Sequence, residues 1–252
     1  MIRPVLSFFL LGFLLSAPVS ANAAPRPERV PVADRELVAI VNLSILKNGA
    51  WHYRYEENRA VKKILRDLGR SYGKIVLITG AGATHDSFLS AIDEAERDPT
   101  VKAVDSIVYL HGHPGEIGFV DTGFYPVDLL RDEILALPDS AVGGRKLRAL
   151  YSDACYGETH LSDWLRAGFR VAAGSVGTDS NWSLDLGKFM RAWRKGKSFG
   201  SAIDRANSVW ATGIMDWFEK GDSFKRTGGD VDFTMDRPTE AEVGAEIEVG
   251  RP

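Results

Sequence analysis

The chain contains one cysteine, Cys155, within the stretch SDACYG (residues 152–157). A thiol attacks carbonyl groups as the thiolate, and its ordinary pKa of about 8.5 leaves only a few per cent ionised at neutral pH. A nucleophilic thiol therefore needs a nearby base, for which histidine is well suited. His111, in YLHGH (residues 109–113), could supply that base. A lone cysteine can also be an inert buried residue or half of an intermolecular disulfide.

The elements that must position these residues can be read from hydrophobic patterns. Short apolar runs rich in β-branched residues predict buried strands at residues 37–43, 74–79, 106–110, 147–151 and 169–174. Apolar residues at helical spacing predict helices at 56–71, 86–97, 127–137, 161–167, 184–193 and 202–218. Strands alternating with helices favour a mostly parallel sheet covered on both faces. We therefore expect an α/β fold, a three-layer α/β/α sandwich.

The predicted strand ends place the chemistry at one edge of this sheet. His111 and Gly112 follow the third predicted strand, and Asp153 and Cys155 follow the fourth. Ligands of such sheets bind beyond the carboxyl ends of the strands. We expect the imidazole and the thiol to meet there. Gly112 would let a substrate backbone approach closely and would leave its N–H available to an oxyanion.

Two motifs resemble those of a known family. SIVYLHG (106–112) and LRALYSDACYG (147–157) resemble the caspase-like cysteine peptidases, which include caspases, metacaspases, legumains, gingipains and clostripain. The caspase signature is Gln-Ala-Cys-x-Gly with a histidine about 50 residues upstream, and Asp153 stands here in place of the Gln. Segments 80–95, 165–178 and 186–206 extend the resemblance, so that it covers roughly residues 38–206.

The resemblance implies a role for each motif residue. Cys155 matches the nucleophile and His111 the general acid/base, while the backbone N–H groups of Gly112 and Cys155 match the oxyanion hole. Asp153 matches the acid that holds a P1 Arg or Lys in metacaspases and clostripain, although legumain-type relatives carry an acid there and cut after Asn. Tyr156 departs from the family pattern, since a small residue is expected there. The resemblance implies no required cofactor, although some relatives use calcium.

Several alternatives remain open. The same fold could serve as a catalytically inactive binding module, or the thiol could act in a transpeptidase or ligase. His113 competes with His111, but Pro114 follows it, whereas the family pattern has Gly after the histidine. A metal bound by His111 and His113 needs a third ligand, such as His85 or Asp121, and no ligand-spaced cluster supports one.

The N-terminus predicts export. A basic start, an apolar run from Val5 to Leu15 and small residues ending at Ala23 have the order of a secretory signal peptide. The run is too short to span a bilayer, which needs about 20 apolar residues. We expect a secreted or periplasmic protein with no stable membrane anchor after signal cleavage.

The remaining chain divides by composition. We expect a lead-in at 24–36, a peptidase domain at 37–220 and an irregular tail at 221–252. The net charge of −3 argues against binding to nucleic acid and leaves a peptide or protein as the expected partner. The loop at 137–145 could be a processing site, and Trp182 could line a substrate pocket.

Overall fold

The computed structural model describes residues 30–43, 51–138, 145–179, 183–208, 216–217, 221–235 and 246–249. The expected signal peptide, Trp182 and most of the expected processing loop (139–144) lie outside these ranges, so these three expectations stay predictions. Within the described ranges, no helix combines the length and apolar character needed to cross a bilayer.

A central sheet organises the described part of the chain. Its seven strands lie in the order β10-β2-β1-β3-β7-β8-β9. They are β1 (Arg35–Asn42), β2 (Lys74–Thr79), β3 (Ala103–Leu110), β7 (Leu147–Ser152), β8 (Val171–Ser175), β9 (Lys225–Gly229) and β10 (Glu246–Val249). Only the β8–β9 pair is antiparallel, so the sheet is mostly parallel, as expected.

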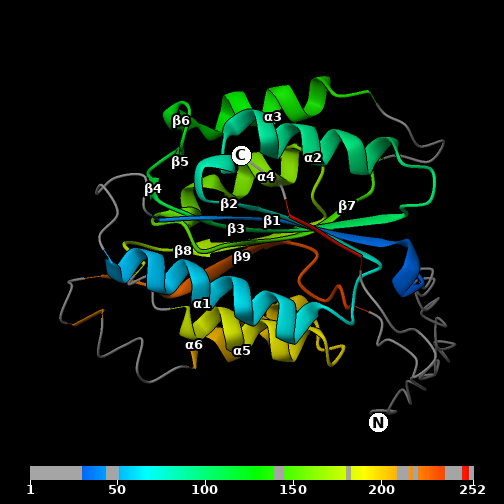
Figure 1. The fold of residues 1–252 in the computed structure, drawn as a ribbon. Helices are drawn as coiled ribbons and strands as arrows, with labels where there is room; N and C mark the ends of the chain where they lie inside the picture. Colours follow the sequence, from blue (N-terminus) through cyan, green and yellow to red (C-terminus); the bar gives the residue numbers. More distant parts are fainter. Residues whose placement is uncertain are drawn as a thin grey trace, which may run out of the picture.

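Helices cover both faces of this sheet (Figure 1). On one face lie α2 (His85–Arg97), α3 (Val127–Ala136) and α4 (Leu161–Arg166); on the other lie α1 (Trp51–Leu68), α5 (Leu184–Trp193) and α6 (Phe199–Asn207). Short 3₁₀ helices are η1 (Val32–Asp34), η3 (Gly80–Gly82) and η4 (Gly157–His160). The expected three-layer α/β/α sandwich is confirmed.

The alternation of side chains along β1 shows how one strand serves two cores. Leu37, Ala39 and Val41 belong to the core beneath α1, α5 and α6, whereas Val38 and Ile40 belong to the core beneath α2, α3 and α4. Successive strand residues point to opposite faces, so a strand covered on both faces must be apolar throughout. This is why the continuous apolar runs predicted the inner strands correctly.

A small second sheet was not expected from the sequence. β4 (Gly112–His113), β5 (Glu116–Phe119) and β6 (Gly123–Pro126) form an antiparallel meander directly after β3. It lies on the left in Figure 1, where the inner parallel strands end. The meander fixes the course of the chain immediately after His111, because the N–H of Gly118 donates back to the His111 carbonyl at 2.9 Å.

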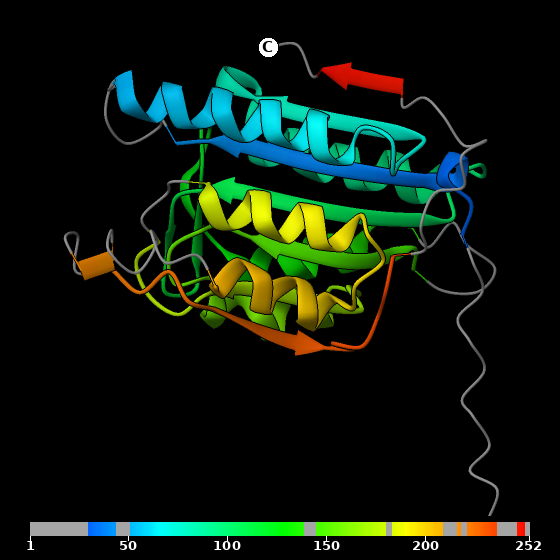
Figure 2. The same ribbon diagram turned by 90° about the horizontal axis from the view of Figure 1, so that it is seen from below.

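The expectation of an irregular tail at 221–252 was wrong. This part of the chain contributes β9 and β10, which extend the sheet at its two opposite edges (Figure 2). The sequence of β9, KRTGG, has neither apolar alternation nor β-branched enrichment, and the strand exists because it pairs with β8. The helix expected at 202–218 begins earlier, and α6 ends at Asn207.

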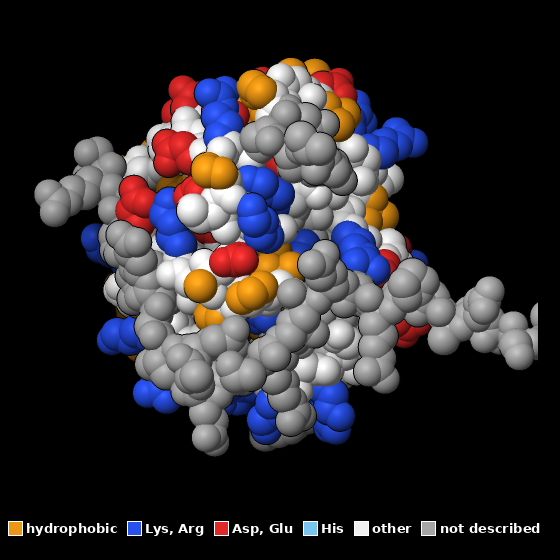
Figure 3. Space-filling model, turned by 90° about the vertical axis from the view of Figure 1, so that its right-hand side faces the viewer, with side chains coloured by type: hydrophobic (Ala, Val, Ile, Leu, Met, Phe, Trp, Pro, Cys, Tyr) orange, Lys and Arg blue, Asp and Glu red, His pale blue; other side chains and the backbone are white. Residues whose placement is uncertain are grey.

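The opposite end of the sheet, where the inner strands begin, carries ion pairs between strands. Figure 3 views the molecule from this side, and basic and acidic side chains are interspersed on the part that it describes. At the start of β2, Lys74 lies 3.7 Å from the buried carboxylate of Glu36 and 3.3 Å from Glu248. These charges are far along the strands from His111 and Cys155, which follow the strand ends.

Candidate active site

Adjacent strands carry the two predicted catalytic residues. β3 and β7 are neighbours, with Val108 opposite Ser152, and His111 and Cys155 follow these strands within three residues. The N–H of Asp153 donates to the carbonyl of Val108 at 2.8 Å, which continues the pairing one step beyond β7. The structure therefore brings both segments to one edge of the sheet.

Gly112 packs directly against the backbone of Cys155. A Cβ placed on Gly112 would overlap the carbonyl oxygen of Cys155 and would lie 3.2 Å from its amide nitrogen. The same Cβ would lie 3.0 Å from the Cβ of Ala154. Only glycine fits this contact. The two residues expected to supply oxyanion N–H groups are therefore in contact along their backbones.

The imidazole of His111 has a fixed orientation. Its Nε2 lies 2.7 Å from the carbonyl oxygen of Leu43, and its ring meets the ring of Tyr53 edge-on at 5.4 Å. A carbonyl only accepts hydrogen bonds, so Nε2 carries the proton. In the neutral ring, Nδ1 then holds the lone pair. Nδ1 is therefore the ring nitrogen that can accept a proton.

Leu43 was not singled out by the sequence, although it follows β1, the strand beside β3. Its own N–H donates to Oε1 of Glu57 in α1 at 2.6 Å. The preceding residue is also held, since the Asn42 amide donates to the Gly80 carbonyl at 2.7 Å. The one sequence signal for Leu43 was its position at the carboxyl end of a buried strand. Its role depends on a main-chain carbonyl, which every residue has, so the residue type gives no indication of it.

The thiol of Cys155 is nearly enclosed, with 8% of the residue exposed. The N–H of Asp179 donates to Sγ at 3.3 Å, and Sγ lies 3.8 Å from the Asp179 carbonyl oxygen. Burial, followed by the Asp179 carboxylate, raises the pKa of the thiol to about 11. In this structure Cys155 is therefore a protonated thiol at neutral pH.

The chain turns sharply just after Cys155. Tyr156 has φ of 57°, in the left-handed region that non-glycine residues rarely adopt, and its N–H donates to the Gly177 carbonyl at 2.8 Å. Gly157 then packs against Gly174 of β8, and a Cβ on either one would overlap the backbone of the other. This glycine pair lets the turn lie directly on the sheet.

Asp153 is fully buried and binds a cation from its own chain. Its Oδ1 lies 2.5 Å from Nζ of Lys225, the first residue of β9. The same ammonium group lies 2.6 Å from Asp179 and 2.8 Å from Asp185. Ser175 contributes a fourth contact at 3.0 Å. We call Asp153, Asp179, Asp185 and Lys225 the acidic cluster.

Burial and mutual charge set the protonation of this cluster. Burial, together with the carboxylate of Asp185, raises the pKa of Asp153 well above its ordinary value. Burial alone would lower the pKa of Lys225, but the three carboxylates raise it well above its ordinary value. Lys225, Asp179 and Asp185 were not identified from the sequence, because residues so far apart give no spacing signal.

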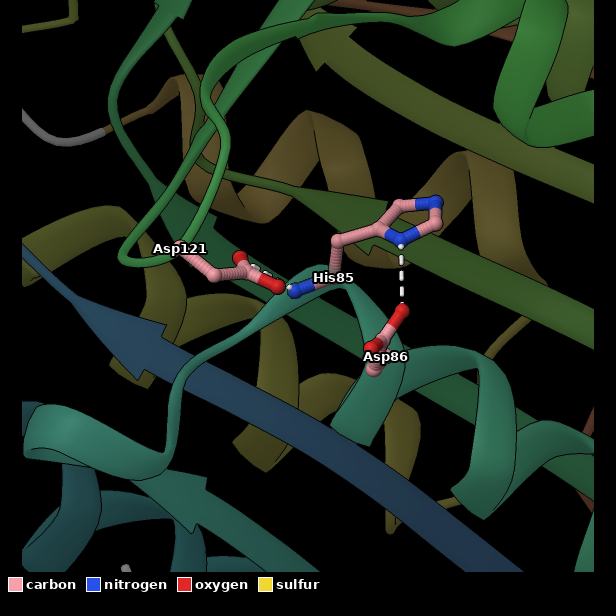
Figure 4. A group of neighbouring side chains, drawn as sticks. All are labelled: His85, Asp86 and Asp121. Carbon is pink, nitrogen blue, oxygen red and sulfur yellow. Dashed lines mark hydrogen bonds and ion pairs between the residues drawn. The ribbon is translucent and has the colours of Figure 1, made fainter.

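The metal alternative involves groups that already have protein partners. Figure 4 shows the ring of His85 facing Asp86 while Asp121 faces the His85 backbone. The His85 ring lies 3.2 Å from Asp86 and 2.7 Å from Glu133, and Asp121 accepts from the His85 N–H at 2.9 Å. These contacts hold the first turn of α2 and its neighbours. His113, which the metal alternative pairs with His111, is exposed, and its ring packs on Phe124.

The sequence matches no model of a known protein family and no curated protein. Solved structures do match. A secreted C11 cysteine protease from Bacteroides thetaiotaomicron, solved with an irreversible peptide inhibitor, aligns with a TM-score of 0.50 at 11% identity over 71% of this chain. Caspase-1 from Spodoptera frugiperda aligns with a TM-score of 0.60 at 13% identity over 90% of this chain. The Arg-specific cysteine proteinase gingipain R aligns with a TM-score of 0.50 at 13% identity over 82% of this chain.

The chain has the caspase-like fold. The resemblance seen in the sequence motifs is thereby confirmed for the fold. The chain spans 59% of the C11 protease and 50% of gingipain R, but 99% of the Spodoptera frugiperda caspase. Fold alone does not fix activity, which depends on the residues of the site.

Proposed function

We propose that this protein is an exported cysteine endopeptidase that acts on peptide or protein substrates, with Cys155 as nucleophile and His111 as general acid/base. The observation that carries the proposal is the backbone contact between Gly112 and Cys155, directly beside an imidazole whose tautomer is fixed by Leu43. Nucleophile, base and oxyanion donors thus come from two neighbouring strand ends. The three structural neighbours are cysteine proteases, which supports the proposal at the level of the fold.

The proposed reaction has two halves. The Cys155 proton passes to Nδ1 of His111 as sulfur attacks the peptide carbonyl, and the oxyanion is held by the N–H groups of Gly112 and Cys155. His111 then returns the proton to the leaving amine, which leaves an acyl-enzyme. Water, deprotonated by His111, attacks the acyl-enzyme, and the proton returns to the thiol. No step requires a group that this chain lacks.

The raised pKa of the thiol defines the resting state. A thiol with a pKa of about 11 has a very small thiolate fraction at neutral pH. The thiol must therefore lose its proton to His111 as it attacks, and the N–H of Asp179, which donates to Sγ at 3.3 Å, favours the thiolate that forms. The burial of Cys155 supports a closed resting site that opens when a peptide enters.

Asp153 belongs to the proposed P1 pocket. It lies two residues before the nucleophile, and its carboxylate binds an ammonium group in this structure. An acidic pocket of this kind has the chemistry to bind a P1 Lys or Arg. A preference for Arg or Lys is expected where this carboxylate is open to substrate; in this structure the carboxylate is bound by the ammonium group of Lys225.

The test is a fluorogenic peptide panel that varies only P1 among Arg, Lys, Asn and Asp. It uses the chain without residues 1–23 under reducing conditions, with Cys155→Ala as control. Cleavage that disappears in the control establishes the nucleophile. Product analysis with an added amine then separates hydrolysis from ligation.

The absence of cleavage of every peptide in the panel would also be informative. The assay is repeated after limited proteolysis, because a cut in the 137–145 loop could release a block. If no peptide is cleaved under either condition, the peptidase proposal fails and a caspase-like binding module is the better description.

A further inference from the structure

The acidic cluster is connected directly to the nucleophile. Asp179 contributes its carboxylate to Lys225 at 2.6 Å and its N–H to the sulfur of Cys155 at 3.3 Å. Asp153 is bound to Lys225 and lies two residues before Cys155. Asp179 thus contacts both the ammonium group of Lys225 and the thiol, and Asp153 joins the same ammonium group to the segment that carries Cys155.

Lys225 places its ammonium group where a basic P1 side chain of the substrate would place its charge. Its side chain is fully buried, and its Nζ lies 5.3 Å from the centroid of the Tyr151 ring and within 2.8 Å of three acidic side chains. We propose that Lys225 is a specificity-determining residue whose ammonium group fills the acidic P1 pocket and masks its affinity for Arg and Lys. The inference rests on the proposed peptidase function and deepens it.

The backbone of Lys225 is held in place by hydrogen bonds, so its side chain stays in the proposed P1 pocket. Lys225 pairs with Ser175 of β8 in the antiparallel ladder. The side chain of Asn207 accepts from the Lys225 N–H at 2.8 Å and donates to its carbonyl at 2.9 Å. A side chain that begins at a doubly held backbone and is 1% exposed remains in the pocket while a substrate binds.

The charges of the cluster explain why masking is effective. A second cation placed beside Lys225 would be repelled at close range in a poorly solvated site. Without Lys225, three buried carboxyl groups would face one another, and a guanidinium or ammonium group from the substrate would favour their ionised forms and pair with them. Oδ2 of Asp153 is buried without a hydrogen-bond partner within the described structure, so it could accept a hydrogen bond from such a group.

The test compares two peptides that differ only in P1, arginine or its uncharged isostere citrulline. In native protein we expect kcat/KM for the two peptides to be similar. In Lys225→Ala we expect the ratio of Arg to citrulline to rise by a factor of about 10 or more, because the pocket then selects for charge. The matched control is Lys74→Ala, which removes another carboxylate-paired lysine at the opposite end of the strands and should leave the ratio unchanged.

Three outcomes overturn the proposal. They are an unchanged ratio in folded Lys225→Ala, an equal rise in Lys74→Ala, and a native preference for Arg over citrulline above about tenfold. Lys225→Met retains most of the buried volume and serves if the alanine variant does not fold. If neither variant folds, the ratio of kcat/KM for the Arg and citrulline peptides in native protein decides whether the pocket is masked.

A binding measurement keeps this inference separate from the peptidase proposal. Agmatine carries the guanidinium group and alkyl chain of an arginine side chain, and its binding is measured by calorimetry in the Cys155→Ala background. We expect binding to the Cys155→Ala/Lys225→Ala double variant and none to Cys155→Ala alone. Binding of agmatine without any peptide cleavage would support the masked pocket while rejecting the peptidase; equal binding to both proteins would reject the masked pocket.

Discussion

The carbonyl oxygen of Leu43 accepts a hydrogen bond from Nε2 of His111 at 2.7 Å. This contact joins the end of β1 to the residue that follows β3, and it decides which imidazole nitrogen can take a proton. A main-chain acceptor cannot be altered by changing its own side chain. Its role is therefore tested through the residues that depend on it and those that hold it.

Replacement of His111 should separate the two histidines of the YLHGH stretch. We expect His111→Ala to lower kcat/KM by about 10²–10⁴, the range for loss of a general acid/base. His113→Ala should have a small effect, since its ring is exposed and packs on Phe124. Steady-state kinetics on the best peptide of the panel measure both. A larger loss in His113→Ala would transfer the role to that residue.

Glu57 should act as a positioning residue through Leu43. Its carboxylate accepts the Leu43 N–H at 2.6 Å, so Glu57→Ala should let the carbonyl drift and should lower kcat about tenfold while KM stays nearly constant. Glu57→Gln keeps an acceptor oxygen and should restore most of the rate. If both variants lose kcat equally, the hydrogen bond is not the reason.

The thiol should react slowly and with an unusual pH dependence. With a pKa of about 11, Cys155 should be alkylated by iodoacetamide about three hundred times more slowly at pH 7.5 than an ordinary thiol of pKa about 8.5. The rate should keep rising tenfold per pH unit above pH 9, where an ordinary thiol levels off. Because Cys155 is the sole cysteine, mass spectrometry follows it directly. A plateau near pH 8 would contradict the closed resting site.

The Gly157–Gly174 contact should not tolerate a methyl group. A Cβ at Gly174 would overlap backbone atoms of Gly157, so Gly174→Ala should lower the free energy of unfolding by about 2 kcal/mol or more. Gly187→Ala is the control, because the atoms nearest to its Cβ in α5 would be the flexible side-chain ends of Arg191 and Lys63. That change should be neutral or stabilising by up to about 1 kcal/mol. Urea unfolding measures both, and similar losses would exclude the proposed contact.

Glu36 should make stability depend on pH. Burial raises its pKa to about 7, against the opposing effect of Lys74, so the folded state favours the protonated carboxyl. Its contribution is complete below the ordinary value of 4.5 and is lost as pH rises through 7. From pH 5 to 8, native protein should lose on the order of 2 kcal/mol relative to Glu36→Gln. Urea unfolding measures the free energy of unfolding of both proteins against pH. A constant difference between them from pH 5 to 8 would show that Glu36 does not titrate in this window.

The sequence by itself predicted the inner sheet and the edge of that sheet to which the segments carrying His111 and Cys155 both lead. Both depend on local patterns, since a strand covered on two faces must be apolar and the residues at its carboxyl end must lie at one sheet edge. Gly112 was also identified from its place after the histidine, and the structure explains it by its contact with the Cys155 backbone.

Only the tertiary structure decided the surroundings of these residues. β9 has no strand signal of its own, and its antiparallel pairing with β8 is what carries Lys225 to Asp153. The orientation of His111 depends on a main-chain carbonyl, which every residue possesses. Contacts between distant segments, and contacts made by the backbone, leave no periodic trace in the sequence, so they appear only once the chain is folded.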